Sequence, residues 1–389
     1  MKPADIRSKA AGRCIKTTGG YCAFVPGPLP KSIDLNEFWP ELDAANASLG
    51  AVEGLAAAAQ LPFLHLFLAS AVRREATSSS QIEGIHTQMP DLLRAEVEDP
   101  DLHRASDDLR ETHNCVRAMY QGHARLQEGL PLVGRLVREL HAILMDHARC
   151  TDPTPGEFRR VQNFIGQGSD TPQTARYVPP PPEEVQRLWK ELEQFINRAP
   201  AMPTLVQCAV MHQRFEAIHP FGDGNGRIGR LLIPLFLHTR GRLEQPLLYL
   251  SEFLESHRRD YYDLLHAVNT HNEWTPWVRF FLRGVTVTSQ KVLCQAKQMT
   301  ALRIELRQRL RKKFRARNLL DELFANPYVN TTRAAGALNV DPKTARRSIA
   351  LMEEQGILRE ITSRKWGKIW VADAILQIID MPEERSQTP

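Results

Sequence analysis

The segment from residue 219 to residue 230 gathers, in one short loop, the residue types that phosphate and proton chemistry use. In order these are His219, Gly222, Asp223, Gly224, Asn225, Gly226, Arg227 and Arg230. Glycines allow the backbone to adopt positive φ angles and to approach a ligand closely, so that successive N–H groups can form an anion site. An apolar segment of helical character follows, and the positive end of a helix starting there favours bound phosphate as well. The spacing therefore predicts a polyphosphate-binding loop.

Four side chains of this loop have distinct chemical uses. Asp223 is a short carboxylate of the kind that holds Mg²⁺ together with phosphate oxygens. Arg227 and Arg230 are three residues apart on the predicted helix, where planar guanidinium groups can bind phosphate oxygens. His219 is the candidate base, because the unperturbed pKa of histidine is about 6.5 and no other group of the loop accepts a proton near neutral pH.

The composition is that of an ordinary folded protein, long enough for two or three domains. The chain has 389 residues, of which 42% are hydrophobic and 24% are charged. The first residues lack the apolar core of a signal peptide, and the longest apolar run is far shorter than the roughly 20 residues of a membrane-spanning helix. We therefore expect a cytoplasmic protein without a membrane partner. Six scattered cysteines without a Cys-x-x-Cys pair predict reduced thiols.

The elements that position the loop are predicted to be mostly helical. Residues 1–30 have an irregular character, whereas 35–93 and 102–147 carry apolar residues at helical spacing. A hairpin with a long turn is predicted for 156–178, where two short apolar runs flank glycines and a proline. A helix from about 204 to 218 should bring the chain to His219, and another should begin near residue 227. Further helices are expected up to about residue 320.

The last seventy residues have the pattern of a separate, basic module. Residues 301–389 hold 17 Lys and Arg against 11 Asp and Glu, so the positive excess of the chain, +5, lies there. Asp341 and Pro342 predict the start of a helix, and a short alternating segment at 357–371 predicts a hairpin. This order resembles a winged helix-turn-helix. Two sets of residues are expected on different faces of the helix, Ala345, Ile349 and Met352 inside and Lys343, Arg346 and Arg347 outside.

The loop from His219 to Arg230 resembles the signature of the Fic family, whose members transfer part of a nucleotide, most often AMP from ATP, to a hydroxyl of another protein. Every position of the family pattern is filled here. The resemblance implies that His219 accepts the proton of a Ser, Thr or Tyr hydroxyl while the oxygen attacks the α-phosphorus and pyrophosphate leaves. It also implies Mg²⁺ on Asp223 and ATP held by Gly222, Gly224, Asn225, Gly226, Arg227 and Arg230.

A second segment, Ser79 to Gly84, resembles the inhibitory pattern of many Fic proteins, which is Ser or Thr, three residues, Glu, and then Gly or Asn. On a helix, Ser79 and Glu83 would lie on one face. The resemblance implies that Glu83 pairs with Arg230 and occupies a phosphate clamp, so that the enzyme rests in an inhibited state. The alternative reading is a solvated glutamate followed by Gly84 as a helix stop.

The 156–178 hairpin resembles the flap of Fic proteins, on which the target docks as an added strand. Ile165 and Tyr177 are the candidate target contacts of this flap. The structural alternative is a hairpin that only covers a core.

Together these patterns predict a mainly α-helical protein with a Fic-fold core, a small β-hairpin flap and a C-terminal winged helix. The predicted domains are an N-terminal helical region at 1–110 with the inhibitory helix, a catalytic core at 111–300 and a winged helix-turn-helix at 315–389. The expected function is that of an autoinhibited protein adenylyltransferase with ATP as co-substrate and Mg²⁺ as cofactor. Its expected partner is a protein with a hydroxyl side chain, and self-modification and a homodimer are further options.

Two alternative functions stay open at this point. One is a DNA-binding regulator whose Fic domain senses ATP, since the basic C-terminal module has helix-turn-helix character. The other is an enzyme whose main direction is the removal of AMP, because a carboxylate at Glu83 can also orient a water molecule.

Overall fold

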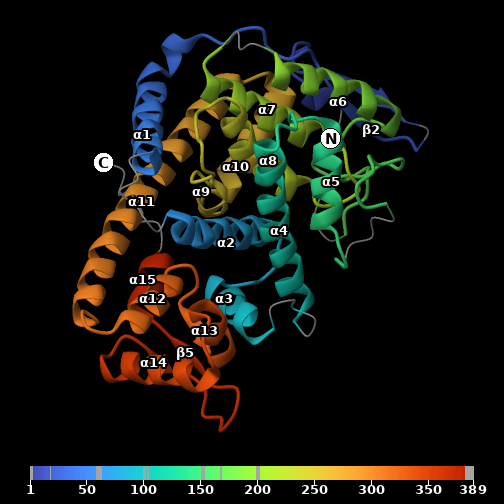
Figure 1. Ribbon diagram of the computed structural model, residues 1–389. Coiled ribbons are helices and arrows are strands. Elements are labelled where there is room, and N and C mark those ends of the chain that lie inside the picture. The colour runs from blue at the N-terminus through green and yellow to red at the C-terminus, as the bar shows by residue number, and fades with distance from the viewer. Residues whose placement is uncertain are drawn as a thin grey trace.

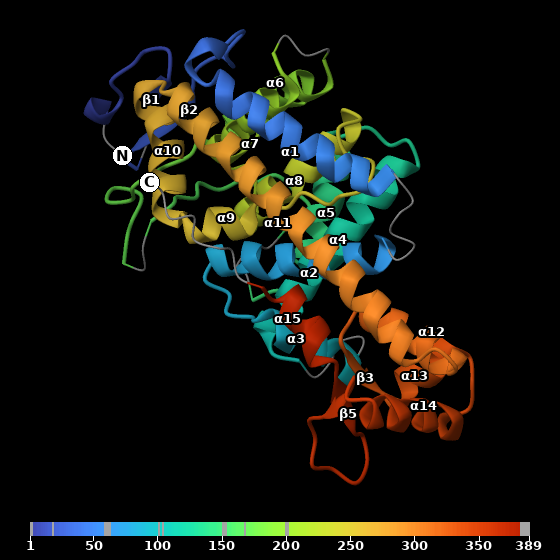
Figure 2. The ribbon, with the colours of Figure 1, turned by 90° about the vertical axis from the view of Figure 1, so that its left-hand side faces the viewer.

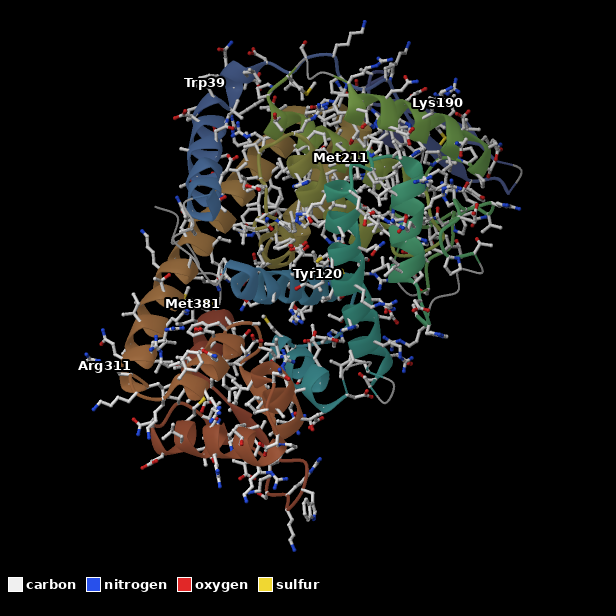
Figure 3. The ribbon with its side chains drawn as sticks, viewed as in Figure 1. Trp39, Tyr120, Lys190, Met211, Arg311 and Met381 are labelled. Carbon is white, nitrogen blue, oxygen red and sulfur yellow. A yellow bond between two sulfur atoms is a disulfide. The ribbon has the colours of Figure 1, made fainter. Side chains whose placement is uncertain are left out.

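One long helix, α11 (Trp274–Arg309), joins a large helical body to a smaller C-terminal module (Figures 1 and 2). The computed structural model describes residues 3–17, 19–57, 64–99, 102, 105–149, 154–166, 169–198 and 202–381. Side chains fill the space between the helices. Met211 lies inside the body, whereas Lys190 and Arg311 point away from it (Figure 3). The body contains the predicted phosphate-binding loop, residues 219–230. The C-terminal module lies below the body in Figure 1.

The N-terminal segment contains a hairpin that the sequence did not predict. Strand β1 (Gly12–Lys16) pairs antiparallel with β2 (Cys22–Pro26), and short 3-10 turns lie at Pro3–Asp5 and Leu35–Glu37. All of β2 is buried, because Phe24 and Val25 pack against the body. The prediction of an irregular start is therefore wrong for these residues. The expectation that all cysteines are thiols is also wrong, since a disulfide joins Cys14 and Cys22.

The body confirms the mainly helical prediction (Figure 1). They are α1 (Trp39–Ala57), α2 (Leu64–Ile82), α3 (Met89–Glu98), α4 (Asp107–Gln127), α5 (Gly134–Leu144), α6 (Pro182–Asn197), α7 (Thr204–Ile218), α8 (Asn225–Thr239), α9 (Ser251–Ser256) and α10 (Arg258–His271). Helix α7 has the bounds that its apolar pattern predicted. Nearly every residue of α7 and α8 is buried, so the loop between them is held on both sides by rigid, central elements.

Among its described residues, the 156–178 segment pairs as a hairpin at one residue pair. Ile165 and Tyr177 form an antiparallel bridge, with N–O distances of 2.8 and 3.2 Å. Beyond this bridge the second arm pairs with another element, because Phe24 of β2 donates its N–H to the carbonyl of Val178 at 2.9 Å. The predicted ladder therefore stays short. The segment is an extended flap that leans on β2.

The C-terminal module, defined here as residues 314–381, has three helices, a small sheet and a final helix. Its elements are α12 (Phe314–Leu323), β3 (Tyr328–Asn330), α13 (Thr331–Leu338), α14 (Pro342–Glu354), β4 (Arg359–Glu360), β5 (Ile369–Val371) and α15 (Asp373–Ile379). The antiparallel sheet has the order β3-β5-β4. Asp341 caps α14 by accepting the N–H groups of Lys343 and Thr344, both at 3.0 Å. Helix α15 was not predicted.

The two faces of α14 are those that its sequence predicted. Ala345, Ile349 and Met352 are buried, whereas the basic residues Lys343, Arg346 and Arg347 are exposed. Across the described residues, no helix combines the length and the apolar character that crossing a bilayer requires.

Candidate active site

The side chain of Asn225 joins the two ends of the loop between α7 and α8 through hydrogen bonds. The Asn225 amide donates to the carbonyl of Phe221 at 2.9 Å and accepts the N–H of Phe221 at 2.8 Å. Since Asn225 is only 2% exposed, its amide is occupied within the loop. The first N–H groups of α8 have no partner within their own helix, as at every helix start, and they are the groups that the loop offers to an anion.

Two glycines of the loop occupy positions that no other residue would fill without a shift. Gly224 has a φ of 70°, and a Cβ there would lie 2.8 Å from the sulfur of Met145. A Cβ on Gly226 would collide with the carboxylate of Glu83 and lie 2.9 Å from Nη1 of Arg230. Gly222 is exposed at the tip of the loop. The glycines therefore allow both the turn and the close approach of Glu83.

His219 follows the last residue of α7 and has the left-handed conformation, with φ 50° and ψ 61°. Its carbonyl accepts a hydrogen bond from Nε of Arg159 at 2.9 Å, which fixes the backbone at this corner. Its Nδ1 is buried, and the ring interacts with the backbone of Glu216. Burial, together with the positive charge of Arg159, lowers the pKa of His219 to about 4. The imidazole is therefore neutral at pH 7 and able to accept a proton.

Asp223 lies at the mouth of the loop with its side chain half exposed. One carboxylate oxygen accepts the N–H of Gly224 at 2.6 Å, and the same oxygen lies 4.0 Å from Nη2 of Arg227. The described part of the chain holds no group of three or more potential metal ligands. A single exposed carboxylate fits an Mg²⁺ ion that takes its other ligands from phosphate and water.

Arg227 is buried beside the carboxylate of Glu111, a residue that the sequence analysis did not predict as part of the site. Its Nη1 donates to Oε2 of Glu111 on α4 at 3.2 Å. The other oxygen of Glu111 accepts Nε of Arg149 at 3.1 Å. A buried carboxylate needs such partners. Because Glu111 lies 116 residues from Arg227, no local sequence pattern predicts the pair.

Arg230 is held by the segment that carries the second motif. Its Nη2 donates to Oε1 of Glu83 at 2.7 Å and to the carbonyl of Ser79 at 2.9 Å, and its Nε donates to Oγ of Ser79 at 2.9 Å. The chain turns away at Gly84, which has a φ of 80°. Burial alone would raise the pKa of Glu83, but the charge of Arg230 outweighs it and the pKa is lowered. The predicted ion pair is present, and the Glu83 side chain is 33% exposed.

His141 of α5 contacts the loop, and the sequence analysis did not select it as a site residue. Its Nδ1 accepts the N–H of Gly156 at 2.9 Å, so its Nε2 carries the proton and donates to the carbonyl of Asp223 at 3.0 Å. Its ring stacks on Phe221 with centroids 3.8 Å apart. His141 therefore links the base of the flap to the phosphate loop, a role that no sequence spacing indicates.

The two residues predicted as flap contacts have different environments. The hydroxyl of Tyr177 donates to the carbonyl of Ala217 at 2.6 Å, and the ring is buried against Phe24. Ile165 is 36% exposed, and Val161 and Phe164 on the same arm are exposed as well. Tyr177 therefore anchors the flap to α7, which leaves the arm of Ile165 as the accessible face.

Comparison with known proteins identifies two matching family models. Residues 131–237 match the model described as Fic/DOC family, and residues 39–124 match the model described as Fic/DOC family N-terminal. The chain is similar to the protein adenylyltransferase Fic of Aedes aegypti, with 33% identity over 147 residues, which is 37% of this chain and 26% of that protein. The protein of the same name from Culex quinquefasciatus is 32% identical over 145 residues, 36% of this chain and 25% of that protein. The chain spans about a quarter of the length of these relatives.

Solved structures share the fold at low sequence identity. A Fic family protein from Desulfovibrio desulfuricans superposes with a TM-score of 0.58 at 19% identity, covering 89% of this chain and 98% of that chain. Fic-1 (residues 134–508) from C. elegans superposes with a TM-score of 0.52 at 19% identity, covering 67% of this chain and 74% of that chain.

Proposed function

The chain belongs to the Fic/DOC family, and we propose that it transfers AMP from ATP to a hydroxyl group of a protein. The observation that carries this proposal is the neutral, half-buried imidazole of His219 at the edge of a glycine-rich loop that leads into α8. The relatives named protein adenylyltransferase support the same reaction.

His219 is the residue that would take the proton of the attacking hydroxyl. The buried position of Nδ1 leaves Nε2 as the nitrogen that a target hydroxyl would meet. As the oxygen of the target attacks the α-phosphorus, its proton passes to the imidazole and pyrophosphate leaves. General base assistance of this kind typically accelerates a reaction by about a hundredfold to ten-thousandfold.

The remaining groups of the loop would hold the triphosphate. The N–H groups at the start of α8 face the phosphates, and Arg227 and Arg230 supply positive charge where the leaving group becomes more negative. Asp223 would hold Mg²⁺, which neutralises phosphate charge when bound. Asn225 would act on the backbone of the loop, since its amide closes the turn at Phe221.

The contact between Glu83 and Arg230 supports a resting state with low activity. The carboxylate lies directly over Gly226, in the space between the start of α8 and the guanidinium group of Arg230. A negative charge there occupies one arginine and repels the terminal phosphate of ATP. We propose that this contact inhibits the enzyme until Glu83 moves.

Self-modification provides the simplest test of the proposed reaction. Glu83→Gly protein incubated with ATP and Mg²⁺ should gain the mass of AMP, measured as intact protein, and the wild type should gain less. The control is Glu83→Gly combined with His219→Ala, which should gain none. Loss of AMP from labelled protein in the presence of wild type alone would instead identify AMP removal as the main direction.

A second candidate function concerns the exposed basic face of the C-terminal module. We propose that it binds duplex DNA, with α14 in the major groove and the β4–β5 loop on the phosphates. The supporting observation is that Lys343, Arg346 and Arg347 are exposed and that Trp366, in the loop beside Lys365, is 73% exposed. Affinity for duplex DNA should fall steeply with salt and should decrease in Arg346→Ala, while Arg309→Ala on α11 should leave it unchanged.

A further inference from the structure

Helix α2 connects the inhibitory contact to the C-terminal module. At its end, Ser79 and Glu83 bind Arg230 of the phosphate loop. Near its middle, Nη2 of Arg74 donates to the carbonyl of Ile379 in α15 and lies 3.4 Å from Asp380. The same helix therefore contacts the candidate active site and the module, through side chains nine residues apart.

Helix α3, which directly follows the inhibitory segment, is attached to the module as well. Nδ2 of Asn326 donates to the carbonyl of Leu93 at 2.8 Å, and Nδ2 of Asn330 donates to the carbonyl of Val97 at 2.7 Å. Asn326 is 1% exposed. Both Figure 1 and Figure 2 show the module lying against α2 and α3. The inhibitory segment, residues 79–84, therefore lies between two contacts with the module. One is made by α2 before the segment and the other by α3 after it.

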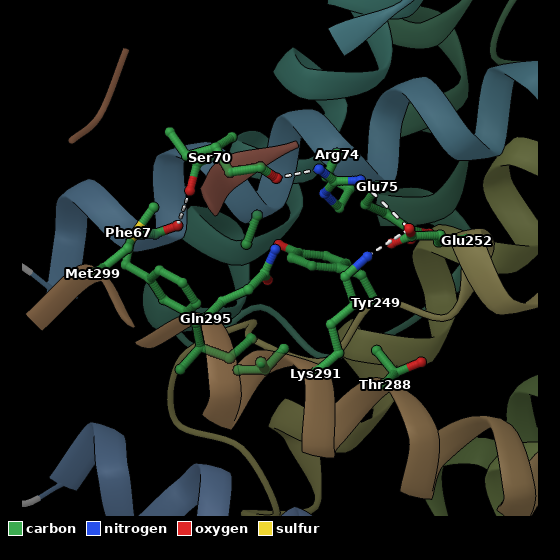
Figure 4. Close-up of a pocket in the computed structure, with 14 residues that line it drawn as sticks. Phe67, Ser70, Arg74, Glu75, Tyr249, Glu252, Thr288, Lys291, Gln295 and Met299 are labelled. Carbon is green, nitrogen blue, oxygen red and sulfur yellow. Dashed lines mark hydrogen bonds and ion pairs between the residues drawn. The ribbon is translucent and has the colours of Figure 1, made fainter. Parts of the chain in front are cut away.

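The contact between α2 and the end of the module is incompletely packed, and Ile379 is the module residue that lines the gap. A cavity of about 40 Å³ lies between α2, α9, α11 and α15, and Figure 4 shows Arg74 and Glu75 facing Glu252 and Lys291 across it. The hydroxyls of Tyr249 and Thr288 on its wall have no hydrogen-bond partner among the described residues. A cavity with unpartnered hydroxyls on its wall indicates loose packing at this contact, whereas a fold's core is densely packed.

A small movement of α2 is enough to break the inhibitory contact. The 19 residues of α2 form a rigid rod, and Arg74 lies about 13 Å from Glu83 along it at 1.5 Å per residue. Since Glu83 and Arg230 are 2.7 Å apart, a shift of roughly 1 Å takes them beyond hydrogen-bonding distance. A movement of the module that shifts α2 by this amount would therefore break the hydrogen bond between Glu83 and Arg230.

We propose that the C-terminal module is a regulatory domain of this protein, which holds α2 in the position that places Glu83 on Arg230. Displacement of the module, by a ligand of its own or by a second protein, releases α2 and opens the phosphate loop to ATP. This inference rests on the inhibitory role proposed above for Glu83. It assigns to the module a function inside the chain, separate from any function in binding DNA.

The test removes the contact of α2 with the module and leaves the active site intact. Arg74→Met deletes the guanidinium group but keeps most of the side chain's packing. We expect it to raise AMP incorporation and the affinity for ATP and Mg²⁺ by roughly threefold to tenfold, the value of one typical hydrogen bond. In the Glu83→Gly background the same substitution should have no further effect.

The matched control is Arg303→Met. Arg303 of α11 pairs with Asp321 of the module at 2.7 Å and is 16% exposed against 18% for Arg74, and this pair joins α11 to α12 instead of α2 to α15. Both substitutions should lower the melting temperature, and only Arg74→Met should change the affinity for ATP. Asn326→Ala, which acts on α3 from the module side, should behave like Arg74→Met.

Hydrogen exchange separates the failure of this inference from the failure of the proposed reaction. Arg74→Met should speed exchange of the amides of residues 79–84, whether or not any AMP transfer is observed. Unchanged exchange and unchanged ATP affinity in folded Arg74→Met and Asn326→Ala would overturn the inference. So would an equal gain in the presence and absence of Glu83, because the module would then act by another route.

Discussion

The carboxylate of Glu83 lies where a side chain on Gly226 would begin, although the two residues come from helical segments far apart in the sequence. This relationship explains two features at once. Gly226 has to be glycine in the resting state because Glu83 and Arg230 fill the space of its Cβ. The same space borders the first N–H groups of α8, where phosphate would bind.

Gly226→Ala should therefore destabilise the wild type more than it destabilises a Glu83→Gly variant. Forcing a methyl group into filled space typically costs about 1–3 kcal/mol. Removal of the carboxylate should relieve most of that cost. The measurement is a double-mutant cycle of unfolding free energies in denaturant. Equal costs in the two backgrounds would show that Glu83 does not occupy this position.

Glu83→Gly should bind ATP and Mg²⁺ more tightly than the wild type, by roughly tenfold to a hundredfold in calorimetry. Glu83 and the buried Arg230 share a charge-assisted bond at 2.7 Å, and bonds to charged groups contribute about 1.5–3 kcal/mol. Gln81→Gly is the control, because Gln81 lies in the same turn and bonds Thr87 instead of Arg230. A similar gain in Gln81→Gly would mean that loosening the helix end, and not loss of the carboxylate, admits the nucleotide.

The sequence predicted those parts of the site whose residues lie close together in the chain. The bounds of α7 and the position of His219 follow from one apolar run that ends at one loop. The pairing of Glu83 with Arg230 came only from the resemblance, since its two partners lie 147 residues apart. The short pattern around Ser79 was compatible with an ordinary helix end.

The features that the sequence did not predict depend on contacts between distant elements. Glu111 is one of many charged residues of α4, and only the fold places it beside Arg227. His141 is held by Gly156 and Asp223, which reach it from two loops. Similarly, the carbonyl of Val178 accepts a hydrogen bond from the N–H of Phe24 in β2. The described residues of the flap pair with each other at one bridge instead of forming the expected hairpin.

His141→Ala should lower the efficiency of AMP transfer without removing any group that would touch ATP. The substitution leaves the N–H of Gly156 and the carbonyl of Asp223 without their partner and removes the ring stacked on Phe221. A misplacement of about 1 Å in a loop of this kind can cost roughly a hundredfold in rate. We expect a fall of that order in kcat/KM in the Glu83→Gly background. His147→Ala, at an exposed site just after α5, should leave kcat/KM unchanged.

The imidazole of His219 should titrate at low pH in the nucleotide-free protein. Burial and Arg159 lower its pKa to about 4, so NMR should show a neutral ring at pH 7. The unfolded chain binds this proton at about pH 6.5, and it therefore holds more protons than the folded chain between about pH 4 and 6.5. The free energy of unfolding should fall as the pH drops through this window. His219→Asn should make that fall smaller, and an unchanged fall would contradict the assigned environment.

The most direct test of AMP transfer uses ATP labelled at either end. Glu83→Gly protein, incubated with Mg²⁺ and a cell extract that supplies hydroxyl-bearing targets, should attach the α-phosphate label to protein and release the γ-phosphate label. The same reaction with Glu83→Gly combined with His219→Ala should attach neither. Attachment of the γ-phosphate label, or equal attachment of the α-phosphate label with and without His219, would contradict the account.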